Sequence, residues 1–198
     1  MAKLCFKYAA MNSGKTIDLI RTAYNYEENG YKVLVLKPLI DSKGGDNIVT
    51  RIGLTRKVDY LISDTDSIIK KLQGKLNNIS AIFVDEAQFL KRKQIDELFK
   101  IAHICDIAVI CYGLRTNFQT KSFEGSLRLF ELAEDLQELK TMCKCGKTAR
   151  FNARKVNGVF VSDGDSIVID GTHEVEYVPL CADCYLDKVI NINDESLN

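Results

Sequence analysis

The sequence has no tryptophan, only two prolines and two histidines, and no excess of charge of either sign. So few prolines, with 12 glycines among 198 residues, exclude a collagen-like chain and argue against a disordered one. The 27 basic and 27 acidic residues cancel, which argues against a protein that coats nucleic acid or binds an anionic membrane through a broad basic surface. The most apolar run, residues 107–114, falls well short of the roughly 20 residues that span a bilayer. What remains is an ordinary globular chain of one domain, or of one domain with a small appendage.

Cysteine is the residue type that stands out, because the chain has seven. The N-terminal segment carries Lys3 and Lys7 in a short apolar run, which is a poor signal peptide, so we expect a cytoplasmic protein with reduced thiols. An odd number also excludes complete disulfide pairing, and clustered cysteines are then considered first as metal ligands. Cys5, Cys105 and Cys111 lie in apolar surroundings, and we expect them to be small core residues.

Apolar segments typical of strands alternate with segments of helical periodicity over residues 1–140. In one of these, Leu19 and Ala23 lie four residues apart on one helical face, and Asn29 and Gly30 provide a stop signal. The expected strands are 4–8, 33–36, 80–84 and 107–112, and the expected helices are 15–28, 66–76 and 94–104. Such alternation predicts an α/β fold with a mostly parallel sheet covered by helices on both faces. Residues 38–53 are expected to form a long loop of the kind that is usually functional or mobile.

The pattern changes after residue 140. Asn157 and Gly158 separate two β-like segments, 150–156 and 159–162, which is a strong hairpin signal. Further short β-like segments follow at 167–169 and 177–180. Residues 141–192 are therefore expected to form a small β-rich module, too small to be stable through a hydrophobic core alone. The polar tail, 193–198, is expected to be frayed.

A phosphate-binding loop is the first functional candidate. Residues 9–16 lie between the first expected strand and the first expected helix, and Gly14, Lys15 and Thr16 fit the pattern G-x-x-x-x-G-K-[ST], although Ala9 replaces the first glycine. Backbone N–H groups at a helix N-terminus form an anion site, Lys15 would reach the β- and γ-phosphates, and the Thr16 hydroxyl would hold Mg²⁺. The alternative is a helix N-terminus without function. The strand and helix on either side favour nucleotide binding, and residues 1–140 are then a RecA-like P-loop domain.

Two adjacent carboxylates, Asp85 and Glu86, end the apolar strand 80–84. In P-loop proteins an acid at this place can hold Mg²⁺, and an acid beside it can polarise an attacking oxygen. Strand alternation points the two side chains to opposite sides, so we expect separate roles. The alternative is a pair of solvated acids without function at a strand end. The presence of the phosphate loop favours the functional interpretation over this alternative. The string Asp-Glu-Ala-Gln is also found in helicases, but those need two such domains and this chain holds only one.

Four cysteines in two close pairs fall in the last third of the chain. The pairs are Cys143-x-Cys145 and Cys181-x-x-Cys184. Four thiolates match a closed, structural Zn²⁺ site, and four protein ligands leave no open position for a catalytic zinc. The alternatives are a redox dithiol or plain buried cysteines, of which the first would need only one pair in a thioredoxin-like context.

Together these motifs resemble the type II thymidine kinases, the zinc-bearing cellular class, from about residue 4 to residue 184. The resemblance is carried by 10–16, 24–27, 51–54, Asp85 to Phe89 and Cys111 to Phe118. It implies transfer of the γ-phosphate of ATP to the 5′-hydroxyl of thymidine in thymidine salvage, with Glu86 as the base that accepts the hydroxyl proton. It also implies two small-molecule substrates, no nucleic-acid or membrane partner, and a homotetramer.

The resemblance further implies a set of residues for ATP and Mg²⁺. Asp41 matches an acid near Mg²⁺ and substrate, and Lys43 stands where the family usually has arginine, which removes a bidentate phosphate contact that Arg51 could share. The full set is Ala9, Ala10, Met11, Asn12, Ser13, Gly14, Lys15, Thr16, Asp41, Asp85 and Gln88.

For the nucleoside, the resemblance implies a ring of apolar side chains around the thymine and a "lasso" loop that closes over the base. The set is Met11, Glu86, Phe89, Leu114, Phe118, Asn152, Val168, Ile169, Gly171 and Tyr177. Asp170 replaces a usual glycine of the lasso. Ordinary core packing is the alternative for the apolar members. In this scheme residues 141–192 are a zinc-stapled lasso module, and the zinc fixes the root of the closing loop.

Two functions of other classes also fit parts of the sequence. A RecA-like ATPase with a zinc ribbon for nucleic acid would need a clustered basic and aromatic segment, which the chain lacks. A nucleotide sensor without activity would not need Lys15, Thr16 and Glu86 together. The sequence therefore favours a nucleoside kinase.

Overall fold

The computed structural model describes residues 2–41, 44–164 and 175–190. Within it the chain forms two compact units. The first contains Met1–Tyr8, Gly14–Arg115 and Phe123–Leu139, and the second contains Ala9–Ser13, Thr116–Ser122 and Lys140–Asn198. Two short segments of the first 140 residues, the start of the phosphate loop and 116–122, thus group with the zinc-module residues.

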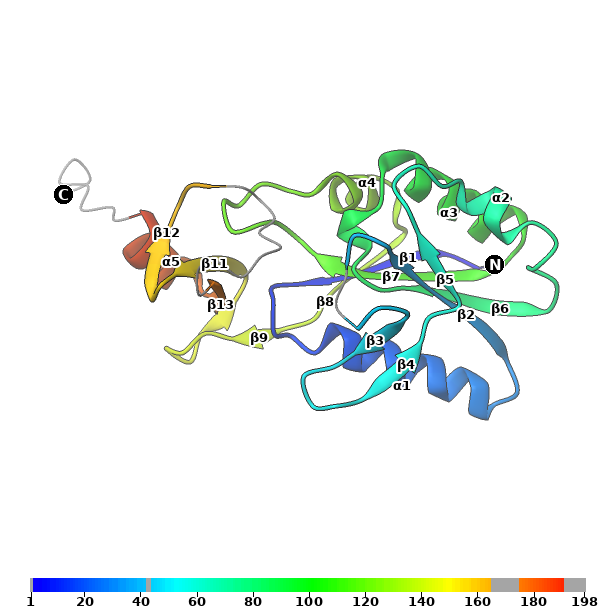
Figure 1. Cartoon of the computed structure of the whole chain (residues 1–198), viewed down its shortest axis with the longest axis horizontal. Coiled ribbons are helices and arrows are strands. Elements are labelled where there is room, and N and C mark those ends of the chain that lie inside the picture. The colour runs from blue at the N-terminus through cyan, green and yellow to red at the C-terminus, as the bar shows by residue number, and fades with distance from the viewer. Residues whose placement is uncertain (1, 42–43, 165–174, 191–198) are drawn as a thin grey trace. The chain divides into compact units, whose positions relative to one another are not determined.

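A six-stranded sheet forms the centre of the first unit (Figure 1). Its order is β5-β2-β6-β7-β1-β8, and the recorded pairings of β2 with β5 and β6, of β6 with β7 and of β1 with β8 are all parallel. The strands are β1 (Leu4–Ala9), β2 (Lys32–Pro38), β5 (Tyr60–Ile62), β6 (Ile79–Val84), β7 (Ala108–Leu114) and β8 (Asp135–Glu138). The predicted α/β fold with a mostly parallel sheet is confirmed.

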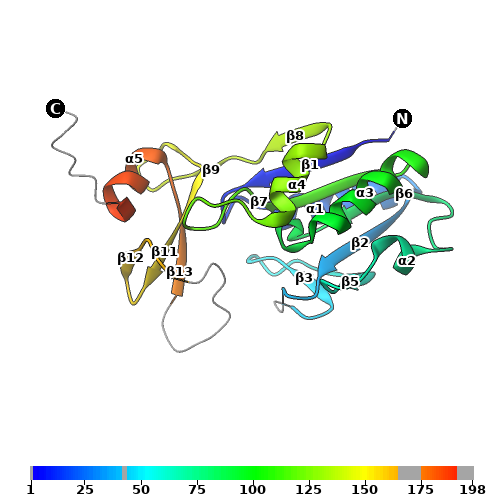
Figure 2. The ribbon, with the colours of Figure 1, turned by 90° about the horizontal axis from the view of Figure 1, so that it is seen from above.

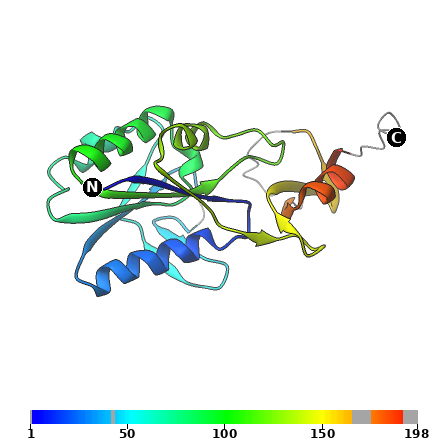
Figure 3. The ribbon, with the colours of Figure 1, turned by 180° about the vertical axis from the view of Figure 1, so that it is seen from behind.

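Helices cover both faces of this sheet (Figures 1 and 3). The α1 helix (Lys15–Glu28) packs on one face through Leu19 and Ala23, which are fully buried in one apolar cluster. The other face carries α2 (Ile68–Leu72), α3 (Arg92–Ile104) and α4 (Glu124–Leu132), whose apolar side chains join a second cluster. The predicted helix 15–28 is confirmed at both ends, whereas α2 is shorter than the expected 66–76.

Two sequence expectations for the first unit need correction. The expected loop 38–53 contains β3 (Asn47–Val49), which pairs antiparallel with β4 (Thr55–Lys57), because Ile48 is buried in the α1-side cluster and holds the hairpin against it. Cys105 is exposed at the end of α3, so it is not a core residue. Cys5 and Cys111 are buried as expected, and burial together with nearby Asp135 raises the pKa of Cys5 to about 12.

A short 3-10 helix, η1 (Ala87–Phe89), follows the acidic end of β6, and α4 packs closely on it. The contact depends on Gly125 in the first turn of α4. A Cβ at this position would lie 2.5 Å from the carbonyl oxygen of Ala87 and 2.7 Å from that of Leu90. Backbone atoms cannot move aside as a flexible side chain can, so glycine is required for this approach.

We expect Gly125→Ala to destabilise the first unit by roughly 1–3 kcal/mol, as overpacking of an interior contact does. Helix propensity alone would favour alanine over glycine by about 1 kcal/mol. A loss of stability would therefore show that the steric clash outweighs the gain in helix propensity. Urea unfolding measures the difference. Leu127→Ala, at an exposed position of the same helix, is the matched control and should change stability little. A Gly125→Ala variant as stable as the parent would contradict the close approach.

The second unit contains a three-stranded antiparallel sheet of order β12-β11-β13 (Figure 2). Asn157 and Gly158, with φ of 50° and 82°, form the predicted turn between β11 and β12. A small core contains Cys143, Ala153 and Leu180. The elements are β9 (Thr141–Met142), β10 (Thr148–Ala149), β11 (Phe151–Val156), β12 (Val159–Val161), β13 (Val175–Leu180), α5 (Ala182–Tyr185) and the π-helix η2 (Leu186–Ile190). The expected segment 167–169 and the tail 193–198 lie outside the described residues.

None of the helices in the described part of the chain is both long and apolar enough to cross a bilayer.

Candidate active site

Lys15 belongs to the predicted phosphate loop, 9–16, and is the first residue of α1. It is buried, with 7% of its surface exposed. Burial lowers the pKa of its amine, and the nearby carboxylates Glu86 and Asp85 counteract this effect. Gly14 has φ of 79°, a left-handed conformation that glycine adopts without strain at the start of the helix. A buried cation at a helix N-terminus is the arrangement expected of a site for anionic phosphate.

Asp85 ends β6 and is buried, with 3% exposed. Burial raises the pKa of its carboxyl, the neighbouring Glu86 raises it further, and Lys15 opposes both. Its Oδ1 atom is buried and has no hydrogen-bond partner among the described residues. A buried carboxylate oxygen without a partner is costly unless something binds it. Carboxylate and hydroxyl oxygens are the donors that Mg²⁺ prefers, so Asp85 fits a magnesium ligand, as Thr16 does by its hydroxyl.

Glu86 has a left-handed backbone, with φ of 47° and ψ of 38°, where β6 turns into η1. Such a conformation is uncommon outside glycine, asparagine and aspartate, and its cost is tolerated when the surroundings fix it. The side chain of Gln88, which is 1% exposed, provides this restraint. Its Nε2 donates to Glu86 Oε2, and its Oε1 accepts from the backbone N–H of Leu114 at 3.0 Å. A Cβ at Gly113 would lie 2.9 Å from Gln88 Oε1, so a side chain at this position would displace the Gln88 amide.

Gln88 thus connects the predicted base, Glu86, with Leu114, a residue predicted to enclose the nucleoside. The resemblance placed Gln88 with the ATP-binding residues, and the sequence carried no signal for this connection.

Asp41, the acid predicted near Mg²⁺, lies 3.1 Å from the ammonium of Lys37. Lys37 is 1% exposed and also donates to the backbone oxygens of Gly45 and Asn47 at 3.4 Å. Lys37 was not identified from the sequence as a site residue, although a lysine at the end of an apolar strand is a recognisable signal of a buried, paired charge. Asp41 acts electrostatically on Asp85, which places it in the same charged cluster. Lys43 lies outside the described residues.

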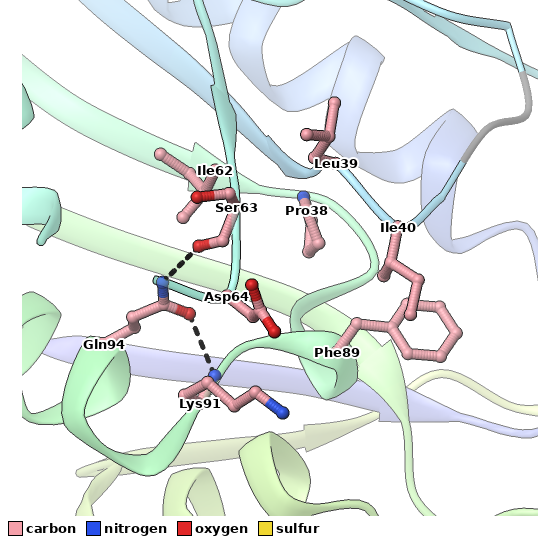
Figure 4. A pocket seen from close by; sticks show the side chains of 9 residues that line it. All are labelled: Pro38, Leu39, Ile40, Ile62, Ser63, Asp64, Phe89, Lys91 and Gln94. Atoms are coloured by element: carbon pink, nitrogen blue, oxygen red, sulfur yellow. Dashed lines mark hydrogen bonds between the residues drawn. The ribbon is translucent and has the colours of Figure 1, made fainter. Parts of the chain in front are cut away.

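Phe89, at the end of η1, is the residue of the predicted nucleoside set that lines a pocket of about 300 Å³ in the first unit. Its ring also packs edge to face on Phe123, with centroids 5.7 Å apart, a partner that the sequence interpretation missed. Figure 4 shows the Phe89 ring beside the side chain of Ile40 at one side of the pocket. The lining residues are Pro38, Leu39, Ile40, Ile62, Ser63, Asp64, Phe89, Lys91 and Gln94.

The start of α3 forms the opposite wall of this pocket (Figure 4). Gln94 donates to the Ser63 carbonyl oxygen at 2.7 Å and accepts from the Lys91 N–H at 2.9 Å. These bonds fix the Gln94 side chain at that side of the pocket, where the polar lining residues Ser63, Asp64 and Lys91 also lie. The volume of the pocket lies at the small end of the range for ligand sites.

In the second unit, Phe118 is almost completely buried, with 1% exposed. Its ring lies under the guanidinium of Arg154, 3.8 Å from centroid to Cζ, and its carbonyl oxygen accepts from the Tyr185 hydroxyl at 2.6 Å. Tyr177 stands opposite Arg154 in the β11–β13 register and so on the same face of the sheet. Of the other predicted lasso residues, Val168, Ile169 and Gly171 lie outside the described residues, as does Asp170.

Asn152 is the remaining predicted nucleoside residue, and it too is buried, with 3% exposed. Its Oδ1 accepts from the backbone N–H of Met11 at 2.8 Å, and its Nδ2 donates to the carbonyl oxygen of Thr116 at 2.8 Å. The Asn152 side chain therefore bonds backbone atoms at both ends, and one of these, the Met11 N–H, belongs to the predicted phosphate loop.

The four clustered cysteines come together as predicted. The sulfur atoms of Cys143, Cys145, Cys181 and Cys184 all lie within 4.8 Å of one another, and the sulfurs of Cys145 and Cys181 are 3.5 Å apart. Four thiolates around one tetrahedral zinc at about 2.3 Å would place the sulfurs about 3.8 Å apart. The donor set and its spacing therefore fit zinc.

Comparison with known proteins decides the family. A model of the family described as thymidine kinase matches residues 2–185, nearly the whole chain. This chain belongs to the thymidine kinase family. Its similarity to named thymidine kinases extends over most of both sequences.

Three curated relatives illustrate the similarity. The thymidine kinase of Francisella tularensis subsp. tularensis is 41% identical over 188 residues, which cover 91% of this chain and 95% of the relative. That of Enterobacteria phage T4 is 43% identical over 184 residues, covering 91% and 94%. That of Streptococcus gordonii is 38% identical over 195 residues, covering 96% and 100%.

Among solved structures, Bacteroides Pif1 bound to single-stranded DNA aligns with 70% of this chain and 38% of its own, at 15% identity and a TM-score of 0.36. A similarity this low carries no inference about function. The family assignment confirms the resemblance drawn from the phosphate loop, the acidic strand end and the cysteine pairs of this thymidine kinase family member.

Proposed function

We propose that this protein transfers the γ-phosphoryl group of ATP to the 5′-hydroxyl of thymidine. The observation that carries the proposal is the cluster of the buried Lys15 and Asp85 with Glu86 where β6 ends, in which both carboxylates act electrostatically on the Lys15 amine. Family membership supports the substrate, and this cluster supports the reaction type. No observation favours the rival ATPase with a nucleic-acid-binding zinc ribbon.

In the proposed reaction, the Glu86 carboxylate accepts the proton of the 5′-hydroxyl of thymidine. At the same time the hydroxyl oxygen forms a bond to the γ-phosphorus. The bond from the γ-phosphorus to the bridging oxygen breaks, and ADP leaves. Phosphoryl transfer depends on alignment and on stabilisation of charge, and Lys15 and the loop backbone from Ala9 to Thr16 are assigned these tasks. Gln88 keeps the Glu86 carboxylate in one orientation.

Asp85 and Thr16 are the residues that we assign to Mg²⁺, with Asp41 beside them. The ion, when bound, neutralises charge on the phosphates. Lys37 keeps Asp41 in place through the ion pair described above. The buried Oδ1 of Asp85 supports this assignment, because it has no protein partner in the described part of the chain.

For the nucleoside we propose the apolar residues Met11, Phe89, Leu114 and Phe118, with Tyr177 and the lasso positions 168–171. Aromatic and aliphatic side chains suit a flat pyrimidine. The four cysteines are proposed to bind one structural Zn²⁺. The spacing of their sulfur atoms, which fits a tetrahedral zinc, supports this proposal.

A product assay with ATP, Mg²⁺ and a panel of nucleosides and oligonucleotides tests the function. We expect formation of thymidine monophosphate, with deoxynucleosides that differ in the base reacting more slowly. ATP hydrolysis that requires DNA and ignores nucleosides would refute the proposal.

Family resemblance also supports a homotetramer with a role in thymidine salvage. Light scattering on the purified protein measures the assembly, and a stable monomer at micromolar concentration would exclude the tetramer. The thiolate zinc site suits a reducing compartment such as the cytoplasm, which localisation in cells would test.

A further inference from the structure

One face of β11 contacts both loops to which substrate binding is assigned. Asn152 projects from this face, and both ends of its side-chain amide are used: Oδ1 for the N–H of Met11 and Nδ2 for the carbonyl oxygen of Thr116, each at 2.8 Å. Met11 lies 141 positions away in sequence. All three residues belong to the second unit.

The phosphate loop is also held by a second contact to the same unit. The Thr141 hydroxyl donates to the carbonyl oxygen of Asn12 at 3.2 Å. Asn12 has φ of 62°, a left-handed conformation that needs support in a residue other than glycine. The N–H of Met11 is directed to Asn152, so it is not one of the donors for phosphate. Asn152 and Thr141 thus set the path of the loop before Gly14.

Residues 116–122, the nucleoside loop that contains Phe118, are also bonded by side chains of the second unit. Asn152 bonds the carbonyl oxygen of Thr116, and the Tyr185 hydroxyl bonds that of Phe118 at 2.6 Å. Tyr185 directly follows Cys184, one of the four clustered cysteines. The loop is therefore hydrogen-bonded to β11 and to α5, the helix that contains Cys184 and directly follows Cys181.

We propose that Asn152 is a positioning residue that fixes the phosphate loop and the nucleoside loop to each other through its side-chain amide. This inference rests on the proposed function, since it takes residues 9–16 as the ATP loop and Phe118 as part of the nucleoside site. It assigns Asn152 a different role from that of a direct thymidine ligand, because the side chain is almost completely buried, with 3% exposed, and makes a protein hydrogen bond at each end.

Asn152→Leu tests this role, because leucine has nearly the same size and removes both hydrogen bonds. The N–H of Met11 and the buried carbonyl oxygen of Thr116 then lose their partners, and the structures of both loops relax. We expect the dissociation constant of ADP, measured by calorimetry without nucleoside, to rise roughly tenfold, and that of thymidine measured alone to rise by a similar factor.

Two further variants separate the two ends. Thr141→Val removes the bond to Asn12 and should weaken ADP binding while leaving thymidine binding near the parent value. Tyr185→Phe removes the bond to Phe118 and should weaken thymidine binding while leaving ADP binding unchanged. Only the Asn152 variant is expected to weaken both ligands. Zinc content and the unfolding temperature are measured on every variant, and affinities are compared for folded, zinc-loaded protein.

An Asn152→Leu protein that binds ADP as the parent does, but binds thymidine weakly, would overturn the proposal and make Asn152 a substrate ligand. If this variant does not fold, Asn152→Ala replaces it, because alanine also removes the bonds to both Met11 and Thr116. Both ADP and thymidine should then bind more weakly, and loss of thymidine affinity alone, or of neither affinity, would overturn the coupling. A parent protein that binds neither ADP nor thymidine would instead refute the proposed function.

Discussion

Glu86→Gln is expected to lower the rate of phosphoryl transfer by roughly 10²–10⁴-fold while leaving ADP affinity close to that of the parent. Glutamine has the same shape as glutamate but cannot accept the hydroxyl proton. The Gln88 amide can still donate to the new side-chain carbonyl oxygen, so the turn that places residue 86 is expected to persist. Single-turnover kinetics with ATP and thymidine measures the chemical step, and calorimetry with ADP measures binding.

Glu97→Gln is the matched control for this prediction. Glu97 is another glutamate of the first unit, buried with 6% exposed, whose carboxylate accepts from the Ser67 hydroxyl and the Ile69 N–H. Its replacement should reduce stability and leave the rate per folded molecule unchanged. A Glu86→Gln protein with the parent's single-turnover rate would remove Glu86 from the role of base.

The parts of the fold that could be predicted are those set by short sequence patterns. Leu19 and Ala23 have helical spacing, and α1 begins and ends where that pattern does. The apolar runs gave the buried strands β2, β6 and β7, because a strand covered on both faces needs no polar alternation. Asn157 and Gly158 gave a hairpin because both adopt positive φ.

The parts that could not be predicted depend on contacts between distant segments. The β3–β4 hairpin has strands of three residues each, too short for a periodic pattern, and depends on burial of Ile48. Nothing local marks Gly125 as the residue against which three backbone oxygens pack. Cys105 has apolar neighbours in sequence but lies at a helix end, where the chain leaves the core.

The candidate site divides in the same way. Lys15, Asp85 and Glu86 lie in motifs whose chemistry is local, and the structure brings them together. The residues that orient the site were not visible as such: Gln88 donates to Glu86 and is anchored by the N–H of Leu114, and Lys37 pairs with Asp41. Motifs predict the reacting groups, whereas the neighbours that orient them depend on the tertiary structure.

Removal of the proposed zinc is the second change from which we expect a large effect. The core of the second unit is small, and binding of a structural zinc contributes on the order of 10 kcal/mol to the folding of comparable small modules. Cys181→Ser, or treatment with a chelator, should therefore unfold the β11–β13 sheet while the first unit keeps its helices. Metal analysis of the parent should find about one zinc per chain.

Cys105→Ser is the matched control, because Cys105 is exposed and lies outside the cluster.

Zinc removal also distinguishes between two possible roles of the metal. If zinc only fixes the root of a loop that closes over thymidine, zinc-free protein should still bind ADP. Thr141 lies two residues before Cys143, and it bonds the phosphate loop at Asn12, as Asn152 does at Met11. We therefore expect zinc-free protein to bind ADP at least tenfold more weakly than the parent, even without nucleoside. A zinc-free protein that retains a folded second unit and full ADP affinity would contradict both the structural role of the metal and its effect on the phosphate loop.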